Sequence, residues 1–472
     1  MKTLFLTPLV PFKVIWGKFH RAGGFIPPIG LLSIAAYIRE KGFAVDIVDA
    51  GVEGLDETSL ARLLREKKPD VVGIPCFTNT ARYVFKTAAI VRAALPGALI
   101  VLGGVHATVM PERTLEECAA ADVVVIGEGE IAFAELLEAR IAAKGFGGVR
   151  GIAHRDGGSL RKTPSREVIQ DLDSLPIMAY DLLKLEKYRP HPTQYKRLPS
   201  YPLLATRGCP FQCTFCSAAR VHGRRLRTRG LDAIFEEIDL LVDRYGAKGL
   251  YIQDSSFLTS RSYVVSFCER MIAGGYRLLW MCNARVDQVD AELVRLMKRA
   301  GCWQITFGVE SANESSLALV KKRQTIPQIV SAVETVKRAG IQVYASYILG
   351  FPGETADDVE RTIEFARALA SQTAIFYLPV PYPGTELLEQ CRTDGGLRED
   401  VAWEDYSSTD FSHPIYVNPR LGKERLLAYY RRAYWRFYSS PRVMLANLRS
   451  IRSSDDIRYY WRAAQALLGL WV

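Results

Sequence analysis

Two long stretches of the chain alternate short β-rich runs with helical segments, and this alternation constrains the fold more than any other feature. In the N-terminal third, segments such as Gly30–Lys41 and Ser59–Lys67 have helical patterns and lie between the β-rich runs. The predicted strands are Thr3–Thr7, Ala44–Asp49, Val71–Pro75, Leu99–Gly103 and Val123–Ile126. Because strands that alternate with helices form βαβ units, residues 1–145 predict a doubly wound, Rossmann-like α/β domain with a parallel sheet.

The same alternation resumes at Tyr201 and continues to about residue 385. The predicted strands are Leu203–Thr206, Gly249–Gln253, Leu278–Asn283, Gln304–Val309, Gln342–Leu349 and Ala374–Val380. The predicted helices are Leu231–Tyr245, Ser262–Ala273, Ala291–Ala300, Ile326–Ala339 and Asp357–Leu369. Six parallel strands with intervening helices predict a (β/α)6 partial barrel, open on one side. Its active site would form at the carboxyl ends of the strands.

The remaining segments complete a four-part division of the 472 residues, which are too many for one ordinary core. We expect a hairpin and linker at 146–200, with the turn of the hairpin at Asp156, Gly157 and Gly158. A helical, basic and aromatic region is expected at 386–472. The chain is thus predicted to contain an α/β domain at 1–145, a linker, a partial barrel at 201–385 and a C-terminal cap.

The excess positive charge is concentrated in the C-terminal region. The whole chain has a formal net charge of +10, and eleven Lys or Arg stand against three Asp or Glu between Arg420 and Val472. Aromatic residues such as Tyr434, Trp435 and Trp461 are interleaved with these basic ones. Three interpretations stay open: packing against the chain's own surface, contact with an anionic membrane or a lipid-like substrate, and RNA binding. Nucleic acid is the least favoured, because no RNA-binding module is recognisable after residue 386.

Cysteine usage and hydropathy indicate a cytoplasmic protein. The nine cysteines are odd in number and scattered, which does not fit a disulfide framework and favours a reducing compartment. No apolar run reaches 18 residues, so no membrane-spanning helix is expected. The segment Met1–Pro8 is too short, and too clearly broken by proline, for a signal peptide. Association with a membrane would therefore depend on the basic tail.

Three cysteines directly after the first predicted barrel strand form a C-x3-C-x2-C pattern: Cys209, Cys213 and Cys216. No fourth cysteine lies within about 50 residues. Thiolates are the soft ligands that iron–sulfur clusters require. Three of them can hold three irons of a [4Fe–4S] cube and leave the fourth iron open to a ligand that is not protein. The pattern therefore predicts a reactive cluster rather than a purely structural one.

The cysteine run resembles the signature of the radical S-adenosylmethionine (SAM) superfamily, including the aromatic residue before the third cysteine, here Phe215. The resemblance implies that the open iron chelates the amino and carboxylate groups of SAM. It also implies that the reduced cluster cleaves SAM to a 5′-deoxyadenosyl radical, with an electron donor such as flavodoxin or ferredoxin.

Polar residues follow the other barrel strands and extend this resemblance to the whole of 201–385. The family places SAM-binding residues at positions that match Arg285, Glu310 and Ser311. An arginine paired with the methionyl carboxylate and a carboxylate accepting ribose hydroxyls are chemically suited to SAM. After the second strand the family often has two acidic residues. Here Gln253 takes the first position, which leaves Asp254 as the candidate catalytic residue.

Three loops at the carboxyl ends of the N-terminal strands carry a second set of candidates. They are Cys76–Thr80, the run Leu102–Thr108 and the run Gly127–Glu130. Paired glycines let the backbone come close to a large ligand. The candidate binding residues are Thr78, Gly103, Gly104, His106, Thr108, Gly127, Glu128 and Gly129. The pattern alone leaves open any flat cofactor, or none.

Together with the run Pro27–Leu31, these loops resemble the cobalamin-binding domain of cobalamin-dependent radical SAM proteins. The resemblance implies that the corrin lies over the strand ends, with the candidate residues around it. Proteins with an axial histidine carry D-x-H-x-x-G, whereas here Lys18 replaces the aspartate before His20. Without an orienting carboxylate, cobalt ligation by His20 is disfavoured, and a solvated loop histidine is expected. We expect His106 to line the cofactor site without binding cobalt.

These features favour a cobalamin-dependent radical SAM enzyme that modifies an unactivated carbon of a small-molecule or lipid-like substrate by methyl transfer. The alternative is oxidative cyclisation or rearrangement, as in the anaerobic magnesium-protoporphyrin monomethyl ester cyclase, whose branch the length and tail resemble. Methylthiolation of RNA would need three more N-terminal cysteines, and only Cys76 and Cys118 are present. A non-enzymatic cobalamin or redox sensor is a minor alternative, since a sensor has no need of the SAM-type residues.

Overall fold

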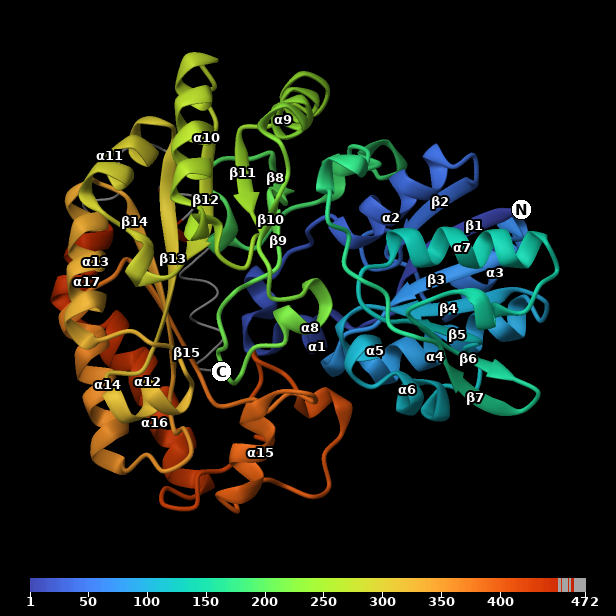
Figure 1. The fold of residues 1–472 in the computed structure, drawn as a ribbon. Helices are drawn as coiled ribbons and strands as arrows, with labels where there is room; N and C mark the ends of the chain where they lie inside the picture. Colours follow the sequence, from blue (N-terminus) through green and yellow to red (C-terminus); the bar gives the residue numbers. More distant parts are fainter. Residues whose placement is uncertain (449–450, 452–456, 458–459, 462–472) are drawn as a thin grey trace.

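Two α/β lobes lie side by side in the computed structural model (Figure 1), which describes residues 1–448, 451, 457 and 460–461. The first lobe is built on a seven-stranded sheet of order β2-β1-β3-β4-β5-β6-β7. Its first five strands are parallel: β1 Lys2–Thr7, β2 Ala44–Asp49, β3 Val71–Pro75, β4 Leu99–Gly103 and β5 Val123–Val125. The predicted doubly wound domain is confirmed.

Helices cover both faces of this sheet because its strands are apolar on both faces. On one face lie α2 Ile29–Glu40 and α7 Glu130–Ile141, and on the other α3 Glu57–Lys67 and α4 Ala81–Ala94. Shorter helices follow the strand ends: α1 Phe12–Trp16, α5 Val105–Val109 and α6 Pro111–Glu117. Buried valine, isoleucine and leucine side chains fill the layers between sheet and helices, and this packing fixes the strand ends that carry the candidate loops.

The predicted hairpin extends the first sheet. Its strands β6 Ile152–Asp156 and β7 Ser159–Lys162 are antiparallel to each other, and β6 pairs with β5 in the register Val124↔Ala153. The rest of the linker forms short 3-10 turns that contact both lobes: Tyr188 Oη donates to Asp49 of the first lobe at 2.9 Å, and Tyr180 Oη donates to Glu237 of the second at 2.7 Å. At its end Gln304 Nε2 donates a hydrogen bond to the carbonyl of Thr193 at 3.0 Å, which connects the linker to the barrel.

The second lobe is a six-stranded, all-parallel sheet of order β15-β14-β13-β12-β11-β8. The strands are β8 Ser200–Leu203, β11 Gly249–Ile252, β12 Leu279–Ala284, β13 Cys302–Glu310, β14 Gln342–Ile348 and β15 Thr373–Tyr377. The helices are α9 Leu231–Tyr245, α10 Arg261–Ala273, α11 Ala291–Arg299, α12 Glu314–Leu319, α13 Ile326–Arg338 and α14 Ala356–Leu369. The predicted (β/α)6 partial barrel is confirmed.

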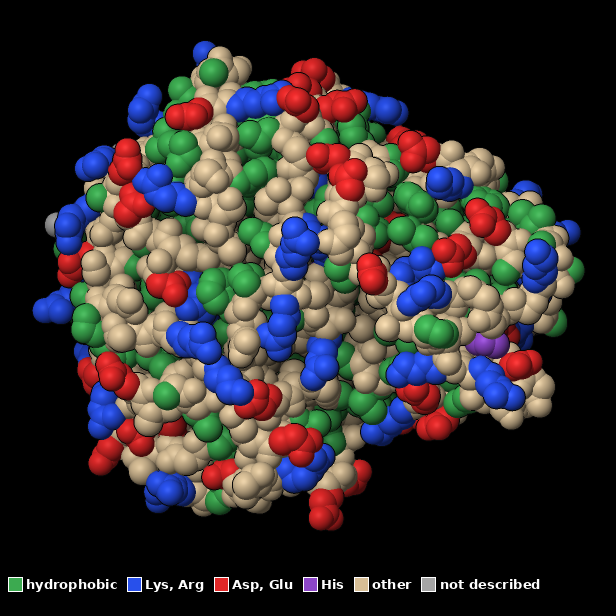
Figure 2. All heavy atoms as spheres, in the orientation of Figure 1, with side chains coloured by type: hydrophobic (Ala, Val, Ile, Leu, Met, Phe, Trp, Pro, Cys, Tyr) green, Lys and Arg blue, Asp and Glu red, His purple; other side chains and the backbone are tan. Residues whose placement is uncertain are grey.

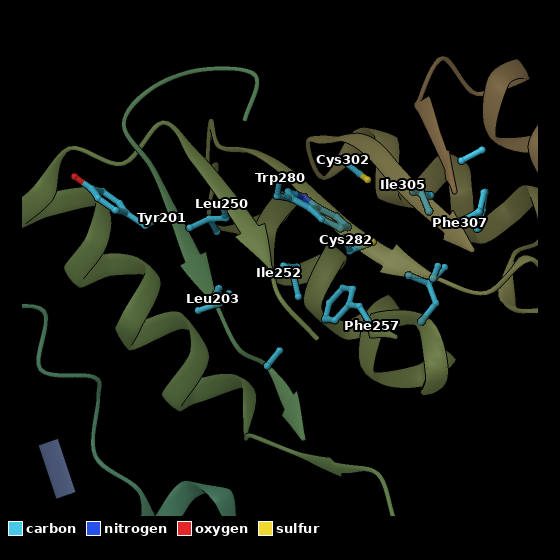
Figure 3. Close-up of a cluster of buried hydrophobic side chains, with 14 of the residues drawn as sticks. Tyr201, Leu203, Leu250, Ile252, Phe257, Trp280, Cys282, Cys302, Ile305 and Phe307 are labelled. Carbon is cyan, nitrogen blue, oxygen red and sulfur yellow. The ribbon is translucent and has the colours of Figure 1, made fainter. Parts of the chain in front are cut away.

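Alternate side chains of the barrel strands pack against the outer helices. Figure 3 shows Leu250 and Ile252 of β11 next to Trp280 and Cys282 of β12, with Phe257 beside them. Phe257 and Trp280 meet edge to face, with ring centroids 5.9 Å apart. The intervening residues of each strand point to the opposite side, into the barrel lumen. This alternation decides which candidate side chains can reach a ligand.

The first barrel strand differs from its prediction at Leu203–Thr206. The sheet contains β8 Ser200–Leu203, and the chain leaves the sheet after Leu203. Thr206–Arg207 then forms a separate strand, β9, which pairs antiparallel with β10 Arg227–Thr228. Each β9 residue is opposite a β10 residue, so this two-residue ladder closes a loop of residues 208–226 that carries the three cysteines.

The C-terminal helices are α15 Glu386–Thr393, α16 Lys423–Tyr438 and α17 Pro441–Leu448. The aromatic face of α16 packs on β15: Tyr434 Oη accepts from the amide of Phe376 and donates to its carbonyl, both at 3.1 Å. Arg432 of the same helix lies 3.4 Å from Glu360 of α14. For this helix the packing interpretation of the basic and aromatic tail therefore holds. Most of the tail after Leu448 lies outside the described residues.

Among the helices that the structure describes, none has the length and apolar character needed to cross a membrane.

Candidate active site at the facing strand ends

The loop closed by β9 and β10 brings the three predicted cluster cysteines into one neighbourhood. Within it, the amide of Cys216 donates to the carbonyl of Cys213 at 3.1 Å, and the amide of Cys209 donates to the carbonyl of Gly223 at 3.2 Å. A short helix, α8 Ala218–His222, follows the third cysteine. These three cysteines are partly or fully exposed, whereas the other six are buried.

The surroundings of Cys213 connect the cysteines with the predicted SAM residues. Partial burial raises the pKa of the Cys213 thiol, while Lys322 and Arg285 lower it and Glu310 and Cys209 raise it further. All of these groups therefore lie within electrostatic range of one sulfur. In the described part of the chain, no three His, Cys, Asp or Glu side chains converge on a single metal ion. A cube in which each iron takes its own thiolate does not need such convergence. Cys209 and Cys213 both lie within electrostatic range of the Cys216 thiol, as a shared [4Fe–4S] cluster requires.

A cavity of about 220 Å³ opens above two of the cysteines. It is lined by Cys213 and Cys216 of the cluster loop and by Thr385 and Glu386 at the start of α15. A larger groove of about 770 Å³ lies at the amino ends of the first-sheet strands, beside Met1. We assign the site to the region of the smaller cavity, because two of the three cluster cysteines line it and the larger groove lies at the opposite edge of its sheet.

Arg285, directly after β12, has the geometry of an anion-binding residue. Its Nε and Nη2 atoms lie 3.0 and 2.9 Å from the two carboxylate oxygens of Asp287, and Nη2 also donates to the carbonyl of Lys322 at 2.6 Å. The guanidinium lies 3.9 Å from the ring centroid of Phe211. Its Nη1 atom is buried and has no hydrogen-bond partner among the described residues. An unpaired donor held this firmly fits a ligand with an anionic group.

Glu310 ends β13 in a left-handed conformation, with φ of 68°. Such a conformation is uncommon for a residue other than glycine, and backbone strain of this kind is retained at some ligand-binding sites. The Glu310 carboxylate accepts from Lys322 Nζ at 2.7 Å, and both side chains are almost fully buried. Lys322 also lies 5.8 Å from the ring centroid of Phe215. Lys322 was not among the predicted residues, because it follows α12 in a turn with no recognisable signal.

Two other predicted residues lie on the outer side of the barrel sheet. The hydroxyl of Ser311 is fully buried and donates to the carboxylate of Glu354 at 3.1 Å. Asp254 comes two positions after Ile252, the last residue of β11, and therefore faces the same outer side. It is fully buried and accepts a hydrogen bond from the amide of Ala205 at 2.9 Å. Burial raises the pKa of Asp254 to about 6. These contacts support structural roles, and the ligand role of Ser311 and the catalytic role of Asp254 stay predictions.

Hydrogen bonds join the three predicted loops at the carboxyl edge of the first sheet. Cys76 donates from its amide to the carbonyl of Gly103 at 2.6 Å, and the amide of His106 donates to the carbonyl of Cys76 at 3.1 Å. The amide of Gly127 donates to Thr108 Oγ1 at 3.0 Å. Gly104 has φ of 99°, and a Cβ there would lie 2.9 Å from the carbonyl oxygen of Cys76. The structure thus brings these predicted residues together, with glycine required at 104.

His106 is fully buried beneath this edge. Its Nδ1 lies 3.4 Å from Thr78 Oγ1, and the ring of Trp403 meets it edge-on at 4.6 Å. Nε2 has no partner among the described residues, and burial lowers the pKa of His106 to about 4. The imidazole is therefore neutral at physiological pH. His20, in contrast, is exposed on its loop, and its Nδ1 lies 3.0 Å from the carbonyl of Gly17.

Two more of the eight cobalamin candidates, Gly129 and Glu128, have close contacts within the protein. Gly129 is close-packed, since a Cβ there would lie 2.7 Å from Ile34 Cδ1. The carboxylate of Glu128 is buried and engaged by Arg227, His222 and the amide of Ile169. Cofactor contact by Glu128 stays a prediction, and its present partners come from the cluster loop and the linker.

The cobalamin-type edge and the cluster loop meet directly. Helix α5, which contains His106 and Thr108, packs against α8 of the cluster loop, and the two helices are neighbours in Figure 1. Next to this contact, a Cβ on Gly384 would lie 3.3 Å from Val109 Cβ. The two sets of candidate residues therefore share one region between the lobes.

Comparisons with known proteins agree with this geometry. The B12 binding domain family matches residues 18–137, and the radical SAM superfamily matches residues 203–366. An uncharacterized methyltransferase of Pyrococcus horikoshii is 33% identical over 422 residues, which are 89% of this chain and 90% of that protein. The chain belongs to the cobalamin-binding radical SAM enzymes. The [4Fe–4S] cluster, SAM and cobalamin predicted from the sequence are therefore its cofactors.

One further relative and one solved structure are also similar to this chain. The anaerobic magnesium-protoporphyrin IX monomethyl ester cyclase of Cereibacter sphaeroides is 31% identical over 433 residues, 89% of this chain and 69% of that protein. Among solved structures, the radical SAM methyltransferase TsrM of Kitasatospora setae superimposes with a TM-score of 0.73 at 16% identity, and the match covers 99% of both chains. At this identity the likeness concerns the fold.

Proposed function

We propose that this radical SAM enzyme transfers a methyl group to an unactivated carbon of a small-molecule substrate. The observation that carries the proposal is the contact of α5, from the cobalamin-type edge, with α8 of the cluster loop. When bound, the cluster and SAM supply a carbon radical and cobalamin supplies the methyl group. A substrate held beside these two helices would be within reach of both.

The residues of this chain would bind SAM by charge. Arg285 presents its unpaired Nη1 atom and Lys322 presents a buried ammonium, so both suit the methionyl carboxylate. Glu310 would accept the ribose hydroxyls, since the hydrogen bond from Lys322 Nζ holds its carboxylate in place. The rings of Phe211 and Phe215 lie beside these groups and exclude water from them.

Electron delivery would take place over the cluster loop. Figure 2 shows several Lys and Arg side chains on the surface around α8, where Arg220, Arg224 and Arg225 are exposed. A basic surface of this kind would attract an acidic protein such as a flavodoxin or ferredoxin. The free thiols and the oxygen-sensitive cluster would suit a reducing cytoplasm. Exposed apolar residues such as Trp435 and Leu448 are the part of the tail that could contact a lipid-like molecule.

Oxidative cyclisation is the second candidate, and the 31% identity to the cyclase of Cereibacter sphaeroides supports it. The two reactions differ in the fate of the SAM methyl group. Methyl transfer places it on the product and leaves S-adenosylhomocysteine. Cyclisation consumes SAM only as a radical source and adds no methyl group.

The test uses the reconstituted enzyme with cobalamin, a chemical reductant and SAM carrying a trideuterated methyl group. The enzyme is incubated with metabolite fractions, and 5′-deoxyadenosine, S-adenosylhomocysteine and labelled products are measured by mass spectrometry. Methyl transfer predicts both nucleosides and a metabolite that carries the deuterated methyl group. Deoxyadenosine formation with an unlabelled, more oxidised product would instead favour cyclisation. A variant with Cys209, Cys213 and Cys216 replaced by alanine is the control for radical formation.

A further inference from the structure

The base of the cluster loop contains two buried arginines directly opposite each other. In the β9–β10 ladder, Arg207 pairs with Arg227 and Thr206 with Thr228. The arginines are only 7% and 5% exposed. Like charges opposite each other in an antiparallel pair are destabilising, and burial increases the cost. A two-residue ladder alone cannot offset such repulsion, so closure of the loop requires negative charge from elsewhere.

Two glutamates of the first lobe supply that charge. Arg227 forms a bidentate pair with Glu128, with Nη1 3.0 Å from Oε2 and Nη2 2.9 Å from Oε1. Arg207 Nη2 lies 2.6 Å from Glu130 Oε1, and its Nη1 lies 3.5 Å from Glu128 Oε1. All four side chains are almost fully buried. Bidentate pairs between arginine and carboxylate are among the strongest and most directional contacts in proteins.

Further hydrogen bonds hold both ends of this arrangement. On the loop side, His222 of α8 places Nδ1 3.0 Å from Glu128 Oε1, and Arg227 Nη2 donates to the carbonyl of His222 at 2.7 Å. On the first lobe, Ser33 Oγ of α2 donates to Glu130 Oε1 at 2.6 Å. The two carboxylates thus contact the base of the cluster loop and the helix that follows its third cysteine.

We propose that Glu128 and Glu130 are positioning residues that latch the cluster loop onto the cobalamin-binding lobe. Neither carboxylate needs to touch cobalamin for this role. The arrangement of the cluster cysteines depends on docking of the first lobe, because the carboxylates that pair with Arg207 and Arg227 in the described part of the chain belong to that lobe. The latch thereby couples the two cofactor sites. Because it concerns the cofactor sites alone, it holds whichever reaction the enzyme performs.

The primary test compares Glu128→Gln and Glu130→Gln with Glu135→Gln. Glu135 lies on the same helix as Glu130, but it pairs with Arg166 of the linker and not with the cluster loop. Hydrogen exchange of residues 208–226 is measured in the full chain, before and after cluster reconstitution. The latch predicts roughly tenfold or faster exchange of this loop in Glu128→Gln and Glu130→Gln, and exchange close to the unmodified chain in Glu135→Gln.

Two spectroscopic measurements separate the latch from a cobalamin contact and from general loss of structure. Cobalamin binding followed by absorbance should stay within about twofold of the unmodified chain, since the carboxylates face the arginines. The change that SAM causes in the electron paramagnetic resonance spectrum of the reduced cluster should weaken in both latch variants and persist in Glu135→Gln. Loss of cobalamin binding with unchanged hydrogen exchange of residues 208–226 would overturn the proposal. It would indicate instead that these glutamates contact cobalamin.

The partner variant Arg227→Lys provides the test if a glutamate variant does not fold. It keeps the charge but loses the bidentate geometry. The latch predicts faster exchange of residues 208–226 in this variant too. In the double variant with Glu128→Gln, the effect should be smaller than the sum of the two single effects. Unchanged exchange in Arg227→Lys, or strictly additive effects, would contradict the latch.

Discussion

A Cβ on Gly308 would lie 2.2 Å from Glu310 Oε1 and 2.6 Å from Lys322 Nζ. Gly308 and Glu310 stand two positions apart on β13 and therefore face the same side, the barrel lumen. Because Gly308 has no side chain, it leaves the space that the buried Glu310–Lys322 pair occupies. The left-handed backbone of Glu310, with φ of 68°, turns its carboxylate back over that space. The absence of a side chain at 308 therefore determines where the pair can sit.

Replacing Gly308 by alanine should displace the Glu310–Lys322 pair and weaken SAM binding by roughly tenfold or more, because a buried pair loses its geometry. Equilibrium binding of SAM to the reconstituted enzyme measures this. Gly30→Ala is the matched control: a Cβ there would have no atom within 4 Å, and alanine favours the helix. Equal SAM affinity in both variants would show that the pair does not contact SAM.

Arg285→Lys should lower SAM affinity while cluster assembly is retained. Lysine keeps the positive charge but cannot pair with both oxygens of Asp287 and also donate to the carbonyl of Lys322. We expect a loss of roughly tenfold or more in SAM affinity, with unchanged iron content. The exposed Arg261, which pairs with Asp290, provides the control Arg261→Lys. A loss of iron in Arg285→Lys, with unchanged SAM affinity of the protein that retains its cluster, would contradict this. It would show that Arg285 supports the cluster loop and does not bind SAM.

His106 should make the stability of the chain depend on pH between about 4 and 6.5. Burial lowers its folded pKa to about 4, below an unfolded value of about 6.5, so the unfolded chain binds more protons in that window. The contribution of His106 to the free energy of unfolding is complete above the unfolded pKa and is lost as the pH falls toward 4. Between pH 7 and pH 5 the loss should be about 2 kcal/mol.

Urea unfolding at pH 7 and pH 5 measures this increment, and His106→Gln should remove it. Burial also lowers the pKa of His191 to about 4, so His191→Gln should remove a second increment of the same sign. If His106→Gln showed the same difference between pH 7 and pH 5 as the unmodified chain, His106 would not be the buried neutral group described above.

Most of the fold could be predicted because local patterns dominate it. The strands β2, β3 and β4 and the helix α9 have the predicted bounds, since each combines apolar periodicity with glycine, proline or charged residues at its ends. The split between β8 and β9 could not be predicted. The partner of β9 is Arg227–Thr228, which follows the 19-residue cluster loop and leaves no local signal at Thr206.

The candidate site was predictable where a motif defines it and not where distant residues meet. The cysteine spacing indicates the cluster within a few residues. Glu128, in contrast, lies 99 positions before Arg227, and no spacing rule connects them. Ser311 directly follows Glu310, but in the structure its hydroxyl is bound to Glu354. Lys322 becomes a candidate only when the turn after α12 brings it beside Glu310 and Phe215.

The central claim is that one chain holds an open-iron cluster and cobalamin at adjoining edges of its two lobes. The most direct test is to purify it anaerobically, reconstitute it with iron and sulfide, add hydroxocobalamin, and count both cofactors alongside the absorbance spectrum. The structure predicts about four irons and about one cobalamin per chain, with the iron lost and the cobalamin retained when Cys209, Cys213 and Cys216 are replaced by alanine. Four irons without cobalamin would contradict the assignment of the first lobe and remove the basis for methyl transfer.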